Sequence, residues 1–255
     1  MTALRAEWTK LRSVRSTTWM LLALAALTIA LGAVSCSTSH TEGGSPGNGG
    51  DDDIVMFSLA GVYLAQIAAV VFGVLAVCSE YATGTIRATF AANPRRREVL
   101  AVKTAIVGAL VLAAAIAATV AAFYLGQAIL HTRGYTYDNG YPAASLADTD
   151  TLRKVALATA YLPVLAVLSL AAAAIVRSTA AAISALLGLL FVPFIVGGLL
   201  PESLGHVITK ASPMAGIAAQ ENGAPIGPWA GFGVTVAWAV GALAVALWVV
   251  ARRDV

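Results

Sequence analysis

Long uncharged stretches dominate the chain, and short polar segments separate them. No Asp, Glu, Lys or Arg occurs in residues 17–39, 54–79, 104–132, 155–176, 178–201 or 222–251. A membrane-spanning helix needs about 20 apolar residues, and each stretch is long enough. The pattern therefore predicts six spans, near residues 18–36, 54–78, 101–130, 154–176, 180–200 and 228–250.

The composition agrees with a lipid environment. The chain is 59% hydrophobic and 11% charged, with a mean hydropathy of +0.81, whereas soluble domains carry about 25% charged residues. A soluble protein this apolar would expose large apolar patches and aggregate. We therefore expect an all-α membrane protein, with residues 1–255 forming a single six-helix transmembrane domain.

The basic residues orient the spans. With these spans, 12 of the 16 Lys and Arg residues fall on the side of both termini, and nine of the 13 acidic residues fall on the other side. Cytoplasmic loops carry an excess of Lys and Arg. This distribution predicts a multi-pass protein of the cell membrane with both termini in the cytoplasm.

Residues 1–17 are predicted to form an amphipathic interfacial helix before the first span. Leu4, Trp8 and Leu11 share one apolar stripe, and Arg12 lies off it. Such a helix rests in the headgroup region of the bilayer, where it either anchors the chain or also frames a docking surface for a cytoplasmic partner. The segment ending at Cys36 loosely resembles a lipoprotein cleavage box, but we expect an uncleaved first helix.

Residues 79–100 form the longest internal loop on the basic side. Gly84 and Thr85 are expected to end the second spanning helix, and Asn93 with Pro94 has the pattern of an N-cap and a first-turn proline. A short helix along the membrane face would fit between these breaks. A loop that only sets the topology does not explain this order of helix, break and helix.

The residues of this loop resemble those of a known family. The pattern Glu80-Tyr81-x-x-Gly84-Thr85-Ile86-Arg87, followed by Pro94-Arg95-Arg96 and Lys103, is similar to the first cytoplasmic loop of ABC-2-type transporter permeases. The stretch from Glu7 to Ser13 is similar to the N-terminal connecting helix of that family.

The resemblance implies the membrane subunit of an exporter that performs no chemistry itself. Its coupling helix would dock on a separate ABC ATPase subunit, which binds ATP and Mg²⁺, and a second permease copy would complete a homodimer or a related heterodimer. The substrate would be a hydrophobic or amphipathic molecule such as a drug or an antibiotic. No cofactor and no nucleic acid is expected on this chain. The docking residues it implies are Glu80, Tyr81, Gly84, Thr85, Ile86, Arg87, Phe90, Pro94, Arg95 and Arg96.

Residues 201–227 connect the fifth and sixth spans. The stretch 212–219 is apolar, begins with Ser212 and Pro213, and is too short to span a bilayer. The family resemblance implies short re-entrant helices in the outer leaflet. From the residues alone, an ordinary surface helix fits nearly as well.

Few polar residues fall inside the predicted spans. Gln66, Tyr124 and Gln127 either hydrogen-bond between helices or line a substrate path. No charged residue is expected inside a span, which disfavours an ion-coupled transporter or a channel. The glycine-rich run 43–50 lacks the Lys-Ser/Thr of a phosphate-binding loop. The principal alternative to an exporter is a scaffold or sensor subunit that uses the same loop to dock an ATPase.

Overall fold

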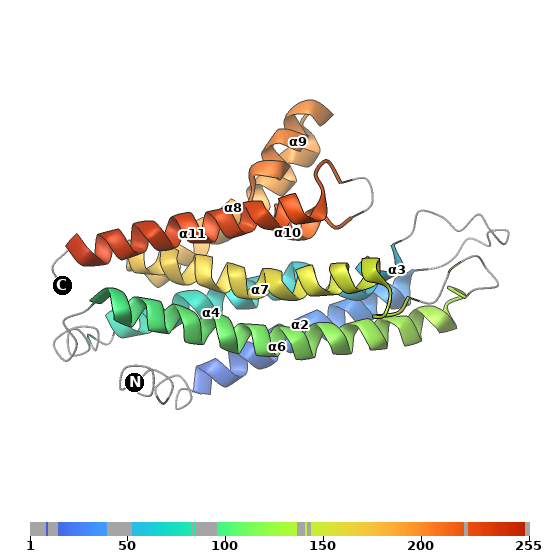
Figure 1. Ribbon diagram of the computed structural model, residues 1–255, viewed down its shortest axis with the longest axis horizontal. Helices are drawn as coiled ribbons and strands as arrows, with labels where there is room; N and C mark the ends of the chain where they lie inside the picture. Colours follow the sequence, from blue (N-terminus) through green and yellow to red (C-terminus); the bar gives the residue numbers. More distant parts are fainter. Residues whose placement is uncertain are drawn as a thin grey trace.

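The computed structural model describes residues 9, 15–39, 53–82, 84, 96–136, 141, 144–221 and 224–252. Within this part of the chain every regular element is helical (Figure 1). The helices are α2 (Arg15–Thr38), α3 (Ile54–Leu59), α4 (Val62–Ala82), α6 (Arg96–Thr132), α7 (Thr149–Val176), α8 (Thr179–Leu199), α9 (Glu202–Ala211), α10 (Ala215–Ala218) and α11 (Pro228–Arg252).

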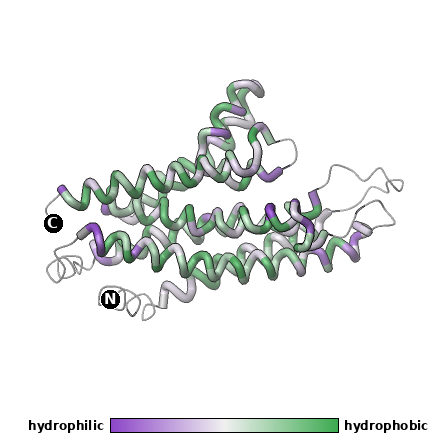
Figure 2. Tube along the Cα trace, in the orientation of Figure 1, coloured by the Kyte–Doolittle hydropathy of each residue, from purple (hydrophilic) through white to green (hydrophobic). Residues whose placement is uncertain are grey.

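Within the described residues, six helical segments are long and apolar enough to cross a membrane, which agrees with the predicted number of spans. They are Ser16–Thr38, Ile54–Tyr81, Arg97–Thr132, Thr149–Val176, Thr179–Leu199 and Pro228–Arg252. Most extend past the predicted limits, since helices continue into the polar flanks. The 37 residues of α6 rise about 55 Å, well beyond the roughly 30 Å of a hydrocarbon core. Figure 2 shows the hydrophilic residues gathered at the helix ends.

The bundle is built around α4 and α7, which pack against each other. In the second span 72% of an apolar stretch of 18 residues is buried. The corresponding share is 22% in the first span and 17% in the fifth. Helix α6 packs against α2 and α7, and α11 packs against α7. Helices α8 and α9 lie side by side and project from the bundle beside α11 (Figure 1).

The first residues of α2 and the last residues of α11 lie at the same end of the bundle (Figure 1). We call this the basic end, because Arg97, Lys103 and Arg252 lie in its helix ends. The turn between α7 and α8, at residues 177–178, is also at this end (Figure 1). Arg177 adopts a left-handed conformation (φ 58°) and its backbone N–H donates to the Ala173 carbonyl at 2.8 Å, a common way to end a helix.

The pattern predicted the second span as a single stretch, near residues 54–78. The structure interrupts this span at Ala60 and Gly61. Hydrogen bonds between residues three apart, as in a 3₁₀-helix, replace the α-helical pattern there. The Tyr63 N–H, for example, donates to the Ala60 carbonyl at 3.2 Å. Helix α2 passes so close that a Cβ on Gly61 would lie 2.0 Å from the Thr28 carbonyl oxygen. Only glycine permits this contact between the two backbones.

The segment between α8 and α11 folds back against α7 and α11. Met214, Ile217 and Gln220 are buried there. Thr235 donates to the Pro213 carbonyl at 2.7 Å, and the Trp238 indole N–H donates to the Ala211 carbonyl at 2.8 Å. Trp238 sits in the middle of the sixth span, away from the interfaces where tryptophan usually lies, and this bond accounts for it.

Candidate functional site

Only some of the predicted docking residues are among those that the structure describes. Glu80, Tyr81 and Gly84 are described, and Arg96 is described as the first residue of α6 without its side chain. The other docking residues lie outside the described residues, namely Thr85, Ile86, Arg87, Phe90, Pro94 and Arg95. The predicted interfacial helix, with Leu4, Trp8, Leu11 and Arg12, also lies outside them. The short helix predicted within this loop and the interfacial helix therefore stay predictions.

Gly84 ends the second span, as the sequence indicated. Helix α4 stops at Ala82, and the Gly84 N–H donates to the Tyr81 carbonyl at 3.3 Å. Gly84 has a φ of 70°, a left-handed conformation that suits glycine far better than residues with a side chain. The helical part of the second span therefore ends at Ala82.

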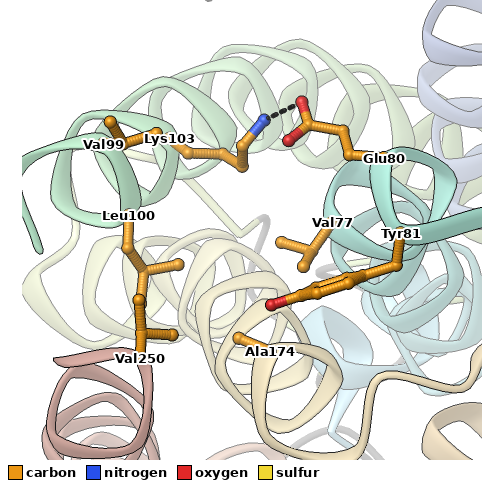
Figure 3. Close-up of a pocket in the computed structure, with 8 residues that line it drawn as sticks. All are labelled: Val77, Glu80, Tyr81, Val99, Leu100, Lys103, Ala174 and Val250. Atoms are coloured by element: carbon orange, nitrogen blue, oxygen red, sulfur yellow. Dashed lines mark hydrogen bonds and ion pairs between the residues drawn. The ribbon is translucent and has the colours of Figure 1, made fainter. Parts of the chain in front are cut away.

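A buried ion pair joins the two helices on either side of this loop. Lys103 of α6 donates to Glu80 of α4 at 2.6 Å, and each side chain is only 4% exposed. Both charges border a cavity of about 20 Å³ that is otherwise walled by apolar side chains of α4, α6, α7 and α11 (Figure 3). A cavity of this size holds about one water molecule. The ion pair therefore acts as a brace at the base of the loop.

A second contact links the brace to the turn between α7 and α8. Tyr81 borders the same cavity, near Ala174 of α7 (Figure 3). The Arg177 guanidinium lies 5.4 Å from the centroid of the Tyr81 ring, within the range of a cation–π interaction. The brace and this contact together connect four spans at the basic end, namely those formed by α4, α6, α7 and α8.

Buried ion pairs in the helices correct the prediction that the spans are free of charge. The uncharged stretches are as expected, but the helices continue past them and carry Glu80, Lys103 and Lys154 into buried positions. At the opposite end of the bundle Lys154 of α7 donates to Asp53 at 2.5 Å. Asp53 also caps α3 by accepting from the Met56 N–H at 3.1 Å. Charge is tolerated because each of these groups has an oppositely charged partner.

Close to Lys154, α7 has a cap of its own. Asp148 precedes the helix and accepts from the N–H and the hydroxyl of Thr151, both at 3.1 Å. These hydrogen bonds lower the pKa of Asp148, because they stabilise its charged form.

Gln66, a predicted path residue, lies in a polar network inside the bundle. It is fully buried, and its side-chain oxygen accepts from the Tyr161 hydroxyl at 2.6 Å. Its amide nitrogen donates to the Tyr63 carbonyl at 2.8 Å, and the Tyr63 hydroxyl in turn donates to Glu221. Tyr161 is seven residues past Lys154, so the network lies about 10 Å further into the bundle.

The other two predicted path residues do not join this network. Tyr124 is 59% exposed on the outside of α6. Gln127 is partly buried and donates to the Ser58 hydroxyl at 3.3 Å. The three residues therefore do not line one continuous surface within a single chain.

Sequence reasoning missed Tyr63 and Glu221 as members of the network. They are 158 residues apart in the chain, and no periodic pattern relates them. The folded-back segment after α9 brings Glu221 to α4. The signal in the sequence is limited to two adjacent polar residues, Gln220 and Glu221, directly after an apolar stretch.

Replacing Tyr161 by phenylalanine is expected to destabilise the bundle, because it leaves the buried Gln66 oxygen without this donor. An unsatisfied buried polar group costs about 1–3 kcal/mol, and hydrogen bonds inside membrane proteins tend to the lower part of that range. We expect a loss of about 1 kcal/mol in the free energy of unfolding in detergent. Tyr124→Phe, which changes an exposed ring, is the matched control. Equal stability of the two variants would contradict the proposed importance of the network.

The fold, the apolar spans and the charged helix ends define a multi-pass helical membrane protein. Residues 38–254 match the family described as "Protein of unknown function (DUF2705)", and the chain belongs to this family. None of the curated proteins matches the chain.

Proposed function

We propose that this chain is the membrane subunit of an ATP-driven exporter of the ABC-2 type, whose ATPase is a separate protein. The observation that carries the proposal is the buried Glu80–Lys103 pair, since it joins the two helices that flank the predicted docking loop. In this proposal the basic end faces the cytoplasm of a cell-membrane protein, as the distribution of Lys and Arg indicates.

The pair matters because it determines what a force on the loop would move. A loop held only by its two peptide connections could shift without moving the spans. With Glu80 bound to Lys103 and Tyr81 against Arg177, a displacement of the loop would move α4 and α6 with the turn between α7 and α8. Closure of ATPase subunits around ATP and Mg²⁺ would thus become a rigid-body movement of spans.

The segment between α8 and α11 lies toward the opposite end of the bundle. It is compatible with an element that closes the outer end of a transport pathway. Trp238 is ten residues past Pro228, about 15 Å along α11, and its indole binds Ala211. In the proposed exporter, residues 201–221 enter the outer leaflet as short re-entrant helices. A second copy of the chain completes the pathway, and a mostly apolar interior favours a hydrophobic or amphipathic substrate.

The docking loop can be tested by charge reversal. The wild-type chain is purified from its native membranes with its ATPase, which is then identified and mixed with variants in detergent. Arg95→Glu with Arg96→Glu is expected to weaken binding of the ATPase by at least about tenfold, because charge reversal at a docking surface introduces repulsion. Arg133→Glu with Lys210→Glu makes the same change in net charge at positions outside the loop and should leave binding unchanged. Equal weakening in both variants would contradict docking through this loop.

Transport is a separate measurement. The chain and its ATPase are reconstituted in vesicles, and ATP hydrolysis and movement of hydrophobic dyes are followed with and without ATP. The proposal predicts ATP-dependent movement that is lost in the Arg95→Glu, Arg96→Glu variant. Binding of the ATPase without any transport would identify a scaffold or sensor subunit instead.

A further inference from the structure

A groove at the basic end lies between the first turns of α6 and the last turns of α11. Its volume is about 430 Å³, and it is shallow and largely open to the outside. Its lining residues are Arg97, Glu98, Ala101, Ala244, Leu247 and Trp248. The groove shares no lining residue with the cavity beside Glu80 and Lys103, and none of its lining residues belongs to the polar network around Gln66.

The groove changes from apolar to cationic along its length. Ala244, Leu247 and Ala101 form apolar walls, and Arg97 is exposed at the rim. Trp248 is 54% exposed, and the Arg252 guanidinium lies 4.6 Å from the centroid of its ring. This cation–π contact holds a second positive charge close to the groove. Among the described residues, one arginine thus lines the groove and a second lies against its Trp248, while Glu98 supplies one carboxylate.

This order of chemistry matches a phospholipid better than a soluble anion. From Ala244 to Arg252 the helix rises about 12 Å, enough to pass from the acyl chains into the headgroup region. Exposed tryptophan is typical of the membrane interface. The planar arginine side chain binds phosphate through two parallel hydrogen bonds. A soluble anion would use the arginines and leave the apolar walls without an occupant.

We propose that this groove binds one anionic phospholipid, with its phosphate between Arg97 and Arg252 and the upper part of one acyl chain along Ala244 and Leu247. The inference does not depend on the exporter proposal, because it rests on the residues that line the groove and not on the docking loop. Anionic lipid is favoured by about fivefold for each arginine near the surface.

The test uses the fluorescence of Trp248 in the full-length protein. The protein is placed in phosphatidylcholine nanodiscs that contain a minor fraction of brominated phosphatidylglycerol or the same fraction of brominated phosphatidylcholine. The Trp248 signal is the difference between the wild type and Trp248→Phe. We expect quenching by the anionic lipid to be half-maximal at an at least fivefold lower fraction than quenching by the neutral lipid. Equal quenching by both lipids would overturn the proposal.

Two pairs of variants separate this site from a general effect of charge or folding. Arg97→Gln with Arg252→Gln should abolish the preference, whereas Arg133→Gln with Lys210→Gln, an equal charge change away from the groove, should keep it. Ala244→Phe fills the groove and should also abolish it, whereas Val240→Phe, at an exposed position of α11 outside the groove lining, should not. Excess inorganic phosphate should have no effect. A preference that survives Ala244→Phe, or that phosphate removes, would contradict a lipid site.

Discussion

Replacing Lys103 by methionine is expected to lower the free energy of unfolding by about 3–5 kcal/mol, the typical effect of removing one partner of a buried ion pair. Methionine is close to lysine in length, so the packing around the side chain changes little. Glu80 is only 4% exposed and would lose the cation that now lies at 2.6 Å. The change should appear as a lower midpoint of unfolding in detergent, followed by circular dichroism.

A double variant shows whether the effect belongs to the pair. Glu80→Gln with Lys103→Met removes both charges, and replacement of a whole buried pair is often nearly neutral. We expect it to recover most of the lost stability. Lys210→Met, which removes a lysine from α9, is the control and should unfold like the wild type. A double variant no more stable than Lys103→Met alone would contradict the importance of the pair between Glu80 and Lys103.

Replacing Gly73 by alanine is expected to destabilise the protein by about 3 kcal/mol, at the upper end of the usual range for overpacking. A Cβ on Gly73 of α4 would lie 2.0 Å from the Ser169 hydroxyl oxygen and 2.3 Å from the Ala166 carbonyl oxygen. The serine could rotate, but the carbonyl belongs to the backbone of α7. Relief therefore requires separation of α4 and α7, the two helices at the centre of the bundle.

Gly108 of α6 provides the matched control for this substitution. A Cβ there would meet only Val167 Cγ2 at 3.6 Å, an ordinary van der Waals contact. Because alanine favours a helix by about 1 kcal/mol over glycine, Gly108→Ala should be neutral or stabilising. Thermal unfolding of the two alanine variants in the same detergent compares them directly. Similar loss in both would mean that close contact of α4 with α7 is not what Gly73 provides.

The candidate site was only partly predictable from the sequence. The loop motif pointed to Glu80 and Tyr81, and the glycine pattern pointed to the end of α4 near Gly84. Lys103 was also part of the motif, but the motif did not indicate that its side chain is buried against Glu80. Whether two charged residues 23 positions apart in the chain meet depends on how α4 and α6 pack, and the packing of side chains is not encoded by a periodic pattern.

The sequence by itself determined the class of the protein, the number of its spans and the positions of most of their ends. It could do so because a bilayer imposes a minimum apolar length and excludes unpaired charge, and both constraints act locally along the chain. The tertiary structure alone decided the interruption at Gly61, the network from Tyr161 to Glu221, and the groove beside Trp248. Each of these depends on close approach between helices that are distant in the chain, which short-range patterns cannot specify.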